Sequence, residues 1–200
     1  MRPIYTTLAL CIVFSSCTKN DLIKNPASEY FPNTVGNYWK YKYVDSISNK
    51  SVFVYVNITG NTVLPNGQNA KIWVYTFPDH TVTNFVCQVG DTTRFIDSPG
   101  LSVRYTYITP LRLNNTWRTS PDYIYDSTHV DDNSVYFLNN QDFVNSFLLQ
   151  EYGHLPNQYW GRSEWFCPNI GIVTKSEKSL FTLADETSSV YWELVEYNLK

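Results

Sequence analysis

The strand pattern of this chain begins with Tyr30-Phe31-Pro32-Asn33-Thr34-Val35-Gly36-Asn37-Tyr38-Trp39-Lys40-Tyr41-Lys42-Tyr43. From Tyr38 onward, aromatic side chains alternate with lysines, so that one face is apolar and the other is charged. This period of two is typical of a half-buried β-strand. Pro32 cannot donate a backbone hydrogen bond to a sheet and Gly36-Asn37 suits a turn, so we expect the strand to begin after them.

Short segments with the same alternation follow along the chain, bounded by turn residues such as Pro65-Asn66-Gly67. They span residues 51–59, 70–77, 82–89, 92–96, 101–108, 122–130, 134–138, 180–183 and 190–199, and residues 165–173 are predicted to form a turn followed by a strand. The composition agrees with strands, because 16 Tyr, 11 Phe and 6 Trp favour β-sheets. The sequence therefore predicts one all-β domain over residues 30–200. We expect an antiparallel meander that forms a strongly curved sheet, either an open barrel or a two-layer sandwich.

A second copy of the opening pattern occurs in the middle of the chain, at Pro110-Leu111-Arg112-Leu113-Asn114-Asn115-Thr116-Trp117. In both copies a proline precedes a tryptophan by seven positions, and an asparagine lies two positions before that tryptophan. This repetition predicts two related halves. A chance match in a chain rich in Pro and Asn is the alternative.

The segment from Gln141 to Glu151 fits two kinds of secondary structure. Phe143, Phe147 and Leu148 have helical spacing, but alternate residues also fit a strand, so periodicity alone does not decide between them. The residues that follow, 153–162, are predicted to form a loop.

Four motifs are spread over the chain, at Phe31–Tyr41, Pro110–Trp117, Trp165–Val173 and Glu193–Tyr197. Together they resemble a broad group of secreted and lipid-anchored Bacteroidota proteins that begin FP-x-x-x-G-x-x-W-x-Y. The resemblance covers nearly all of the mature chain. It departs at Asn114-Asn115, where the group prefers Gly, and at Cys167. The resemblance implies that residues 141–152 form a strand. Since the group has no established activity, it implies location and scaffold rather than mechanism.

Residues 1–16 have the features of a secretory signal peptide. A cationic start at Arg2 precedes an apolar run over residues 8–14 and two small residues before Cys17. The apolar run is too short to span a membrane. The Phe-Ser-Ser-Cys end resembles a bacterial lipoprotein cleavage site, with Cys17 as the lipidated first residue of the mature protein and residues 17–29 as the lipidated cysteine and tether. An ordinary signal peptide with an incidental cysteine is the alternative.

The expected lipid anchor also predicts a location. Acylation with palmitate and further chains attaches a protein stably to a membrane, since two or more chains are needed for lasting attachment. Lys19-Asn20-Asp21 carries one acidic residue soon after Cys17, a weak form of the signal that directs Bacteroidota lipoproteins to the cell surface. We therefore expect an outer-membrane lipoprotein on the periplasmic face or at the cell surface.

Charge and motif content argue against several classes of protein. The net charge is -3 without a basic stripe, which argues against a nucleic-acid partner. His80, His129 and His154 lack the spacing of metal ligands, and neither Gly-x-Ser-x-Gly nor a phosphate-binding glycine loop occurs. We expect no metal, no cofactor and no enzymatic activity.

Two pairs of carboxylates keep a hydrolase as a minor alternative. Glu151 and Glu164 flank a segment rich in Trp and Tyr, and Glu193 and Glu196 lie on the last predicted strand. Paired carboxylates beside aromatic residues can cleave glycosides. Solvated charges at the edges of strands explain the same residues without catalysis.

Cys87 and Cys167 are the cysteines that remain in the β domain. In an oxidising envelope compartment they could form a disulfide. Two buried thiols that act as small apolar residues are the alternative.

Three Asp-Ser/Thr tripeptides, each followed by an apolar residue or Thr, resemble the acceptor of Bacteroidota O-glycosylation. Their acceptor residues are Ser46, Thr92 and Ser127, each in or beside a predicted turn. Since the tripeptide is short, the prediction depends on the three matches together.

Aromatic side chains give the one positive indication of binding. Tyr152, Tyr159, Trp160 and Trp165 cluster in the predicted loop region. Exposed Trp and Tyr stack on sugars or anchor protein partners, although core filling explains large side chains equally well. The sequence thus predicts a non-catalytic cell-envelope lipoprotein that binds a ligand or a protein partner. A carbohydrate-binding accessory lipoprotein that uses these four aromatics is the alternative.

Overall fold

A computed structural model describes residues 30–97, 102–120, 127–155, 158–181 and 187–200. The predicted signal peptide, Cys17 and the tether lie outside the described residues. Within the described ranges, no helix is both long enough and apolar enough to cross a membrane.

The described residues form one sheet of twelve antiparallel strands. The strands are β1 (Tyr38–Asp45), β2 (Lys50–Val63), β3 (Asn69–Thr76), β4 (Thr81–Val89), β5 (Thr92–Ile96), β6 (Val103–Ile108), β7 (Thr116–Arg118), β8 (Ser127–Leu138), β9 (Gln141–Leu155), β10 (Gln158–Cys167), β11 (Gly171–Phe181) and β12 (Thr187–Asn198). Each strand pairs with the next in the chain except β6 with β7, and β12 pairs with β1. The sheet order is therefore β6-β5-β4-β3-β2-β1-β12-β11-β10-β9-β8-β7.

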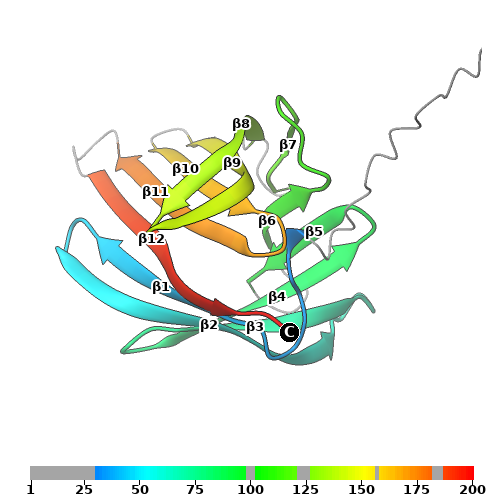
Figure 1. Ribbon diagram of the computed structural model, residues 1–200. Coiled ribbons are helices and arrows are strands. Elements are labelled where there is room, and N and C mark those ends of the chain that lie inside the picture. Colours follow the sequence, from blue (N-terminus) through cyan, green and yellow to red (C-terminus); the bar gives the residue numbers. More distant parts are fainter. Residues whose placement is uncertain (1–29, 98–101, 121–126, 156–157, 182–186) are drawn as a thin grey trace, which may run out of the picture.

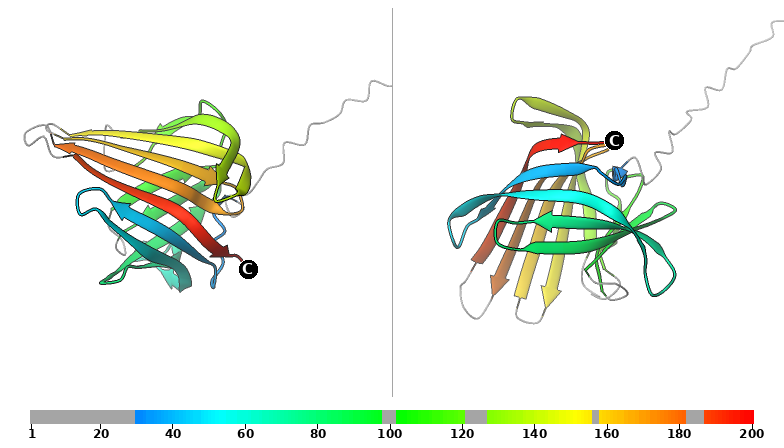
Figure 2. Two further views of the ribbon diagram at one scale, coloured as in Figure 1. Left: turned by 60° about the vertical axis from the view of Figure 1, so that its left-hand side comes forward. Right: turned by 90° about the horizontal axis from the view of Figure 1, so that it is seen from below.

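The sheet curls into a nearly closed, barrel-like shape. One layer runs from β1 to β6 and the other from β8 to β12, and the two layers face each other across the core (Figures 1 and 2). The two edge strands meet through side chains: Trp117 Nε1 donates to Thr106 O at 2.7 Å, and Ser120 Oγ donates to Val103 O at 2.6 Å. The predicted strongly curved antiparallel meander is confirmed.

Backbone hydrogen bonds fix the turn that precedes β1 at the start of the first half of the sheet. Gly36 has φ 92°, in the left-handed region that glycine adopts readily. Its N–H donates to Ile58 O at 2.8 Å, and Ile58 N–H donates back to Asn37 O at 3.0 Å. Asn37 N–H donates to Thr34 O at 3.1 Å, which closes the turn before Trp39.

The same hydrogen bonds recur at the start of the second half. Asn114 has φ 65°, which asparagine tolerates better than most residues do. Asn114 N–H donates to Val130 O at 2.9 Å, Val130 N–H donates to Asn115 O at 2.9 Å, and Asn115 N–H donates to Arg112 O at 3.0 Å. The repeated motif therefore forms the same turn at the start of β1–β6 and at the start of β7–β12.

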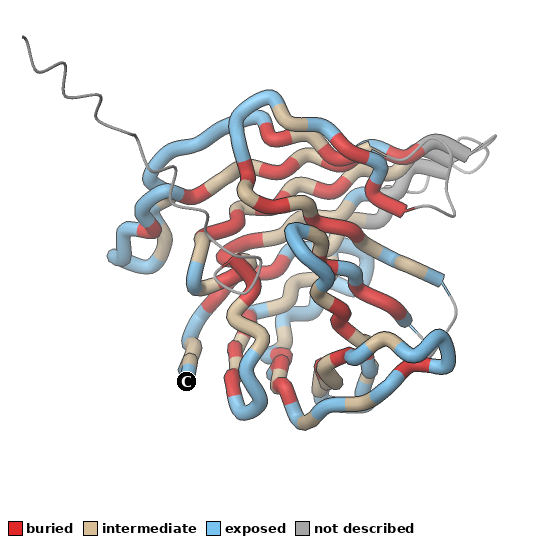
Figure 3. Tube along the Cα trace, turned by 90° about the vertical axis from the view of Figure 1, so that its right-hand side faces the viewer, coloured by how far each residue is buried: buried red, intermediate tan, exposed pale blue. Residues whose placement is uncertain are grey.

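Aromatic residues fill the space between the layers. Trp39 is 2 % exposed, stacks on Trp73 at 5.0 Å between ring centroids, and donates from Nε1 to Ile170 O at 2.7 Å. Phe31 lies between the layers, with its ring centroid 4.5 Å from Tyr107 and 4.6 Å from Phe166. Buried and exposed segments alternate along the strands, as period-two patterning requires (Figure 3).

Residues 141–162 settle one prediction and correct another. Gln141–Leu155 is strand β9, as the resemblance implied, and no part of it is helical. The predicted loop over residues 153–162 is wrong, because β9 continues to Leu155 and β10 begins at Gln158. In the register of β9 and β10, Gly153 lies opposite Trp160, so the glycine makes room for the indole rather than ending the strand.

Candidate functional site

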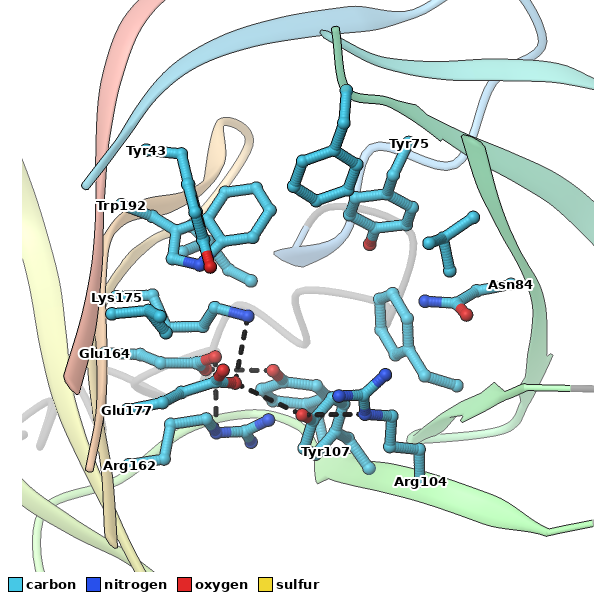
Figure 4. A pocket seen from close by; sticks show the side chains of 16 residues that line it. Tyr43, Tyr75, Asn84, Arg104, Tyr107, Arg162, Glu164, Lys175, Glu177 and Trp192 are labelled. Atoms are coloured by element: carbon cyan, nitrogen blue, oxygen red, sulfur yellow. Dashed lines mark hydrogen bonds and ion pairs between the residues drawn. The ribbon is translucent and has the colours of Figure 1, made fainter. Parts of the chain in front are cut away.

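A cavity of about 240 Å³ lies between the two layers. Eight strands line it, namely β1, β3, β4, β5, β6, β10, β11 and β12. Figure 4 shows the labelled polar side chains converging on it from both layers. Because strands from both halves contribute, the cavity exists only when the sheet is curled.

One wall of the cavity is aromatic. Tyr43 meets Trp192 with ring centroids 5.0 Å apart and Phe77 at 5.7 Å, and Phe77 meets Trp192 at 5.8 Å. The interplanar angles lie between 78° and 86°, so all three pairs have the edge-to-face arrangement that aromatic rings favour. We name Tyr43, Phe77 and Trp192 the aromatic wall.

The opposite side is built on a buried arginine. Arg162 on β10 bonds Glu151 on β9, with 2.6 Å from Nη2 to Oε2, and Glu164 on its own strand, with 3.3 Å from Nε to Oε1. Its guanidinium carbon lies 3.7 Å from the centroid of the Tyr105 ring. Burial by itself would lower the pKa of Arg162, but Glu164, Tyr107 and Glu151 outweigh it and hold that pKa well above its usual value.

Two tyrosines of the edge strand β6 join this network. Tyr107 OH donates to Glu164 Oε2 at 2.8 Å, and Tyr105 OH donates to Glu177 Oε1 at 3.2 Å. Burial raises the pKa of Tyr107 well above its usual value, so its hydroxyl keeps its proton and remains a donor. These bonds hold β6 against β10 and β11 from inside the sheet.

A second ion pair faces the cavity from β11. Lys175 Nζ lies 3.0 Å from Glu177 Oε1 and 4.8 Å from the centroid of the Trp192 ring. Burial would raise the pKa of Glu177, but the positive charges of Lys175, Arg162 and Arg104 outweigh it and lower this pKa to about 2. Both Lys175 and Glu177 are therefore charged at neutral pH.

Four residues that line the cavity each carry a buried polar atom with no hydrogen-bond partner. Within the described ranges these atoms are Asn84 Oδ1, Arg162 Nη1, Glu164 Oε1 and Trp192 Nε1, of which Glu164 Oε1 lies 3.3 Å from Arg162 Nε in an ion pair. A buried polar group without a partner costs about 1–3 kcal/mol, and native proteins contain few of them. The cavity that these polar residues and the aromatic wall line together is the candidate site.

The structure does not bring together the three predicted binding aromatics whose side chains it describes. Tyr152 lies on β9 and is 55 % exposed, and the side chain of Tyr159 lies outside the described residues. Trp160 packs against Gly153, whereas Trp165 stacks on Tyr136 at 4.7 Å. Trp160 and Trp165 are an odd number of positions apart on β10, so they face opposite sides of the sheet.

The carboxylates of the hydrolase alternative also have other partners. Glu151 and Glu164 both bind Arg162, an arrangement of a charge network rather than of an acid and a base that share a substrate. Glu193 accepts from Asn139 Nδ2 at 3.0 Å, and Glu196 accepts from Tyr38 OH. Within the described residues, no group of three or more His, Cys, Asp or Glu could hold a metal ion.

Cys87 and Cys167 are both free and buried, so the alternative of two thiols is the one that the structure shows and the disulfide is not formed. Burial raises the pKa of both thiols. Cys87 belongs to a small cluster with Leu64, Ala70 and Ile96, and Cys167 belongs to the main core.

The predicted glycosylation acceptors lie between or at the ends of strands. Ser46 is exposed between β1 and β2, and its Oγ accepts from Ser189 Oγ at 2.8 Å. Thr92 begins β5, and Ser127 begins β8. Their modification stays a prediction.

Sequence reasoning named Glu164 as a candidate for catalysis but missed the other charged residues of the cavity, although a signal was present. Arg162 and Glu164 are two positions apart, as are Lys175 and Glu177, so each pair shares one face of its strand. Opposite charges at that spacing within aromatic segments indicate an inward-facing pair. Such a pattern differs from the one-sided lysines of β1.

No family model and no curated protein matches the chain. Two solved structures are similar in shape. One is a predicted lipoprotein of Parabacteroides distasonis, with a TM-score of 0.44 and 15 % identity over 84 % of this chain and 98 % of that one. The other is a predicted exported protein of Bacteroides fragilis with a YmcC-like fold, with a TM-score of 0.47 and 12 % identity over 84 % of this chain and 98 % of that one. Likeness at this level does not establish a shared function.

Proposed function

We propose that this chain is a non-catalytic outer-membrane lipoprotein, anchored through Cys17, whose β domain binds a small polar molecule in the interior cavity. The observation that carries the proposal is the cavity of about 240 Å³ between the two layers, which the aromatic wall and the charged side chains of Arg104, Arg162, Lys175 and Glu177 line together. A ligand with polar groups supplies partners for such a site, and aromatic residues supply its contact area.

The charge network supports binding rather than chemistry. Catalytic acids and bases need one group that holds a proton and one that has lost it near neutral pH. Here Glu177 is ionised well below neutral pH and its partner Lys175 is protonated, so neither can exchange a proton with a substrate at that pH. Glu164 is engaged by Arg162 and by Tyr107 OH.

Filling the cavity tests the proposal. Val82 lines it from β4, whereas Val89, on the same strand, is 58 % exposed. The lipidated protein is extracted from the envelope in mild detergent, and small molecules released on denaturation are identified by mass spectrometry. A molecule that accompanies the wild type and Val89→Phe but not Val82→Phe is the expected result. Identical extracts from all three proteins would sink the proposal.

The anchor has a separate test. Radiolabelled palmitate is expected to be incorporated into the wild type and lost in Cys17→Ser, which then leaves the membrane fraction. Incorporation that survives Cys17→Ser would show that this cysteine is not the acylated residue. Protease accessibility on intact cells distinguishes the cell surface from the periplasmic face.

A further inference from the structure

The charges around the cavity already compensate one another. Arg162 pairs with Glu151 and Glu164, and Lys175 pairs with Glu177. Arg104 also lines the cavity and pairs with Asp97 at 3.6 Å from Nη1 to Oδ1, so each of the three lining cations has a carboxylate partner. A charged ligand would find no unpaired side chain of opposite charge here, and desolvating an unpaired charge is costly. This pairing favours an uncharged ligand.

Hydrogen-bond donors and acceptors both remain available to such a ligand. The Lys175 ammonium has three N–H donors, and Glu177 takes one of them. The hydroxyls of Tyr43 and Tyr75 and the amide of Asn84 point toward the same space (Figure 4). A hydroxyl both donates and accepts, so a ligand with several hydroxyls can bind the lysine and the carboxylate together.

Size and apolar surface narrow the ligand further. The cavity of about 240 Å³ is smaller than the roughly 300–1,000 Å³ of pockets that hold drug-sized ligands. That volume suits one small ring rather than a chain of several rings. The aromatic wall can cover one side of this ring while its polar groups face Lys175, Glu177 and Asn84.

We infer that the cavity binds a neutral sugar ring of hexose size, either as a free monosaccharide or as the terminal unit of a glycan. This inference rests on the proposed function and names the ligand class for the same cavity. The paired charges disfavour sugar acids and amino sugars, several hydroxyls match the mixed donors and acceptors, and one ring fits the volume. The site is distinct from the scattered aromatics of β9 and β10.

Matched probes test the class of ligand. Glucose, galactose, mannose and N-acetylglucosamine are compared with glucuronate and glucosamine by saturation-transfer NMR and calorimetry, with the lipidated full chain in a detergent that has no sugar headgroup. At least one neutral sugar is expected to bind, and its charged counterpart about tenfold more weakly, the equivalent of about 1.4 kcal/mol. A disaccharide that binds when its monosaccharide does not identifies the terminal unit of a glycan.

Variants then locate the binding. Val82→Phe is expected to abolish sugar binding and Val89→Phe to leave it unchanged. Asn84→Leu is expected to weaken binding about tenfold while the melting temperature stays equal or rises, because a buried oxygen without a partner is removed. That combination separates a ligand contact from a structural role.

The inference fails if no neutral sugar binds, if a charged analogue binds more tightly, or if Val82→Phe leaves sugar binding intact. The proposed function can survive the first two outcomes, provided that the envelope extract still yields a molecule whose retention depends on Val82. If the extract yields none, the proposed function fails with it.

Discussion

Acid should remove a defined amount of stability through Glu177. This carboxylate lies 3.0 Å from Lys175 Nζ and accepts a hydrogen bond from Tyr105 OH at 3.2 Å. Burial opposes its ionisation, but Lys175 on the same strand, Arg162 on β10 and Arg104 on β6 together lower its pKa from 4.5 to about 2.

The sign follows from proton binding. Because the folded pKa is lower than the unfolded one, the unfolded state binds more protons when the pH lies between the two values. The contribution of Glu177 is therefore complete above about pH 5 and is lost as the pH falls toward 2. One pKa unit corresponds to about 1.4 kcal/mol, so the change from 4.5 to about 2 corresponds to about 3 kcal/mol.

Urea denaturation of the wild type and of Glu177→Gln, at steps from neutral pH down to about pH 2, measures this contribution. The wild type is expected to lose about 3 kcal/mol more than the variant over the acid range. Acidic groups elsewhere, including Asp45 and Asp79, whose pKa values are also lowered, act in both proteins and cancel in the difference. If the free energy of unfolding fell by the same amount in the two proteins as the pH was lowered, the reasoning would be refuted.

A matched pair of lysine variants checks the cause. Lys175→Met removes the partner ammonium, so the carboxylate loses its closest positive charge. The loss of stability on acidification should then occur at higher pH than in the wild type. Lys178→Met changes an exposed lysine on the same strand and should leave the pH of this loss unchanged. Equal shifts in both would mean that general charge, not the ion pair, sets the acid response.

Three other predictions concern the fold. Gly153→Ala should destabilise the protein by about 1–3 kcal/mol in urea denaturation, because a Cβ there would lie 2.0 Å from the Trp160 ring. Gly60→Ala is the control, since the nearest atom to its Cβ would lie at 3.8 Å and no clash is expected. Trp117→Phe removes the bond to Thr106 O and should speed hydrogen exchange of β6 amides while β2 amides keep their rates. Both thiols of the β domain should react with a thiol reagent in denaturant without reductant and stay unreactive in the native protein, and a missing reaction in denaturant would mean that they are paired.

The sequence predicts the scaffold well where each side chain has a single structural role. Period-two alternation identifies β1 because its aromatics face the core and its lysines face solvent. Pro110 to Trp117 predicts the second half because a turn with a left-handed residue needs Gly or Asn at one position, as Gly36 and Asn114 show. The backbone geometry of such a turn depends on a few neighbouring residues, so the local sequence predicts it.

The sequence predicts the cavity poorly because its residues are brought together by long-range pairing. Tyr107 and Glu164 are 57 positions apart and meet through a hydrogen bond only once the sheet has curled. Arg162 and Glu164 have the alternation of a strand but the wrong polarity for a core, so a polar segment with Gly161 is predicted as a loop. Gly153 misleads for a related reason, since glycine indicates a turn as readily as it indicates room for Trp160.

The joint between β6 and β7 connects the fold to the cavity. The equivalent joint of the other half, β12 with β1, is a full antiparallel ladder, whereas β6 and β7 meet through two side-chain hydrogen bonds. The edge strand β6 is held instead from inside, by Tyr105 on Glu177 and Tyr107 on Glu164. Removing one partner of a buried ion pair is strongly destabilising, whereas apolar residues of similar volume in place of the whole pair often hold an element equally well. A charged interior at this joint is therefore what the proposed ligand site needs and not what the fold requires.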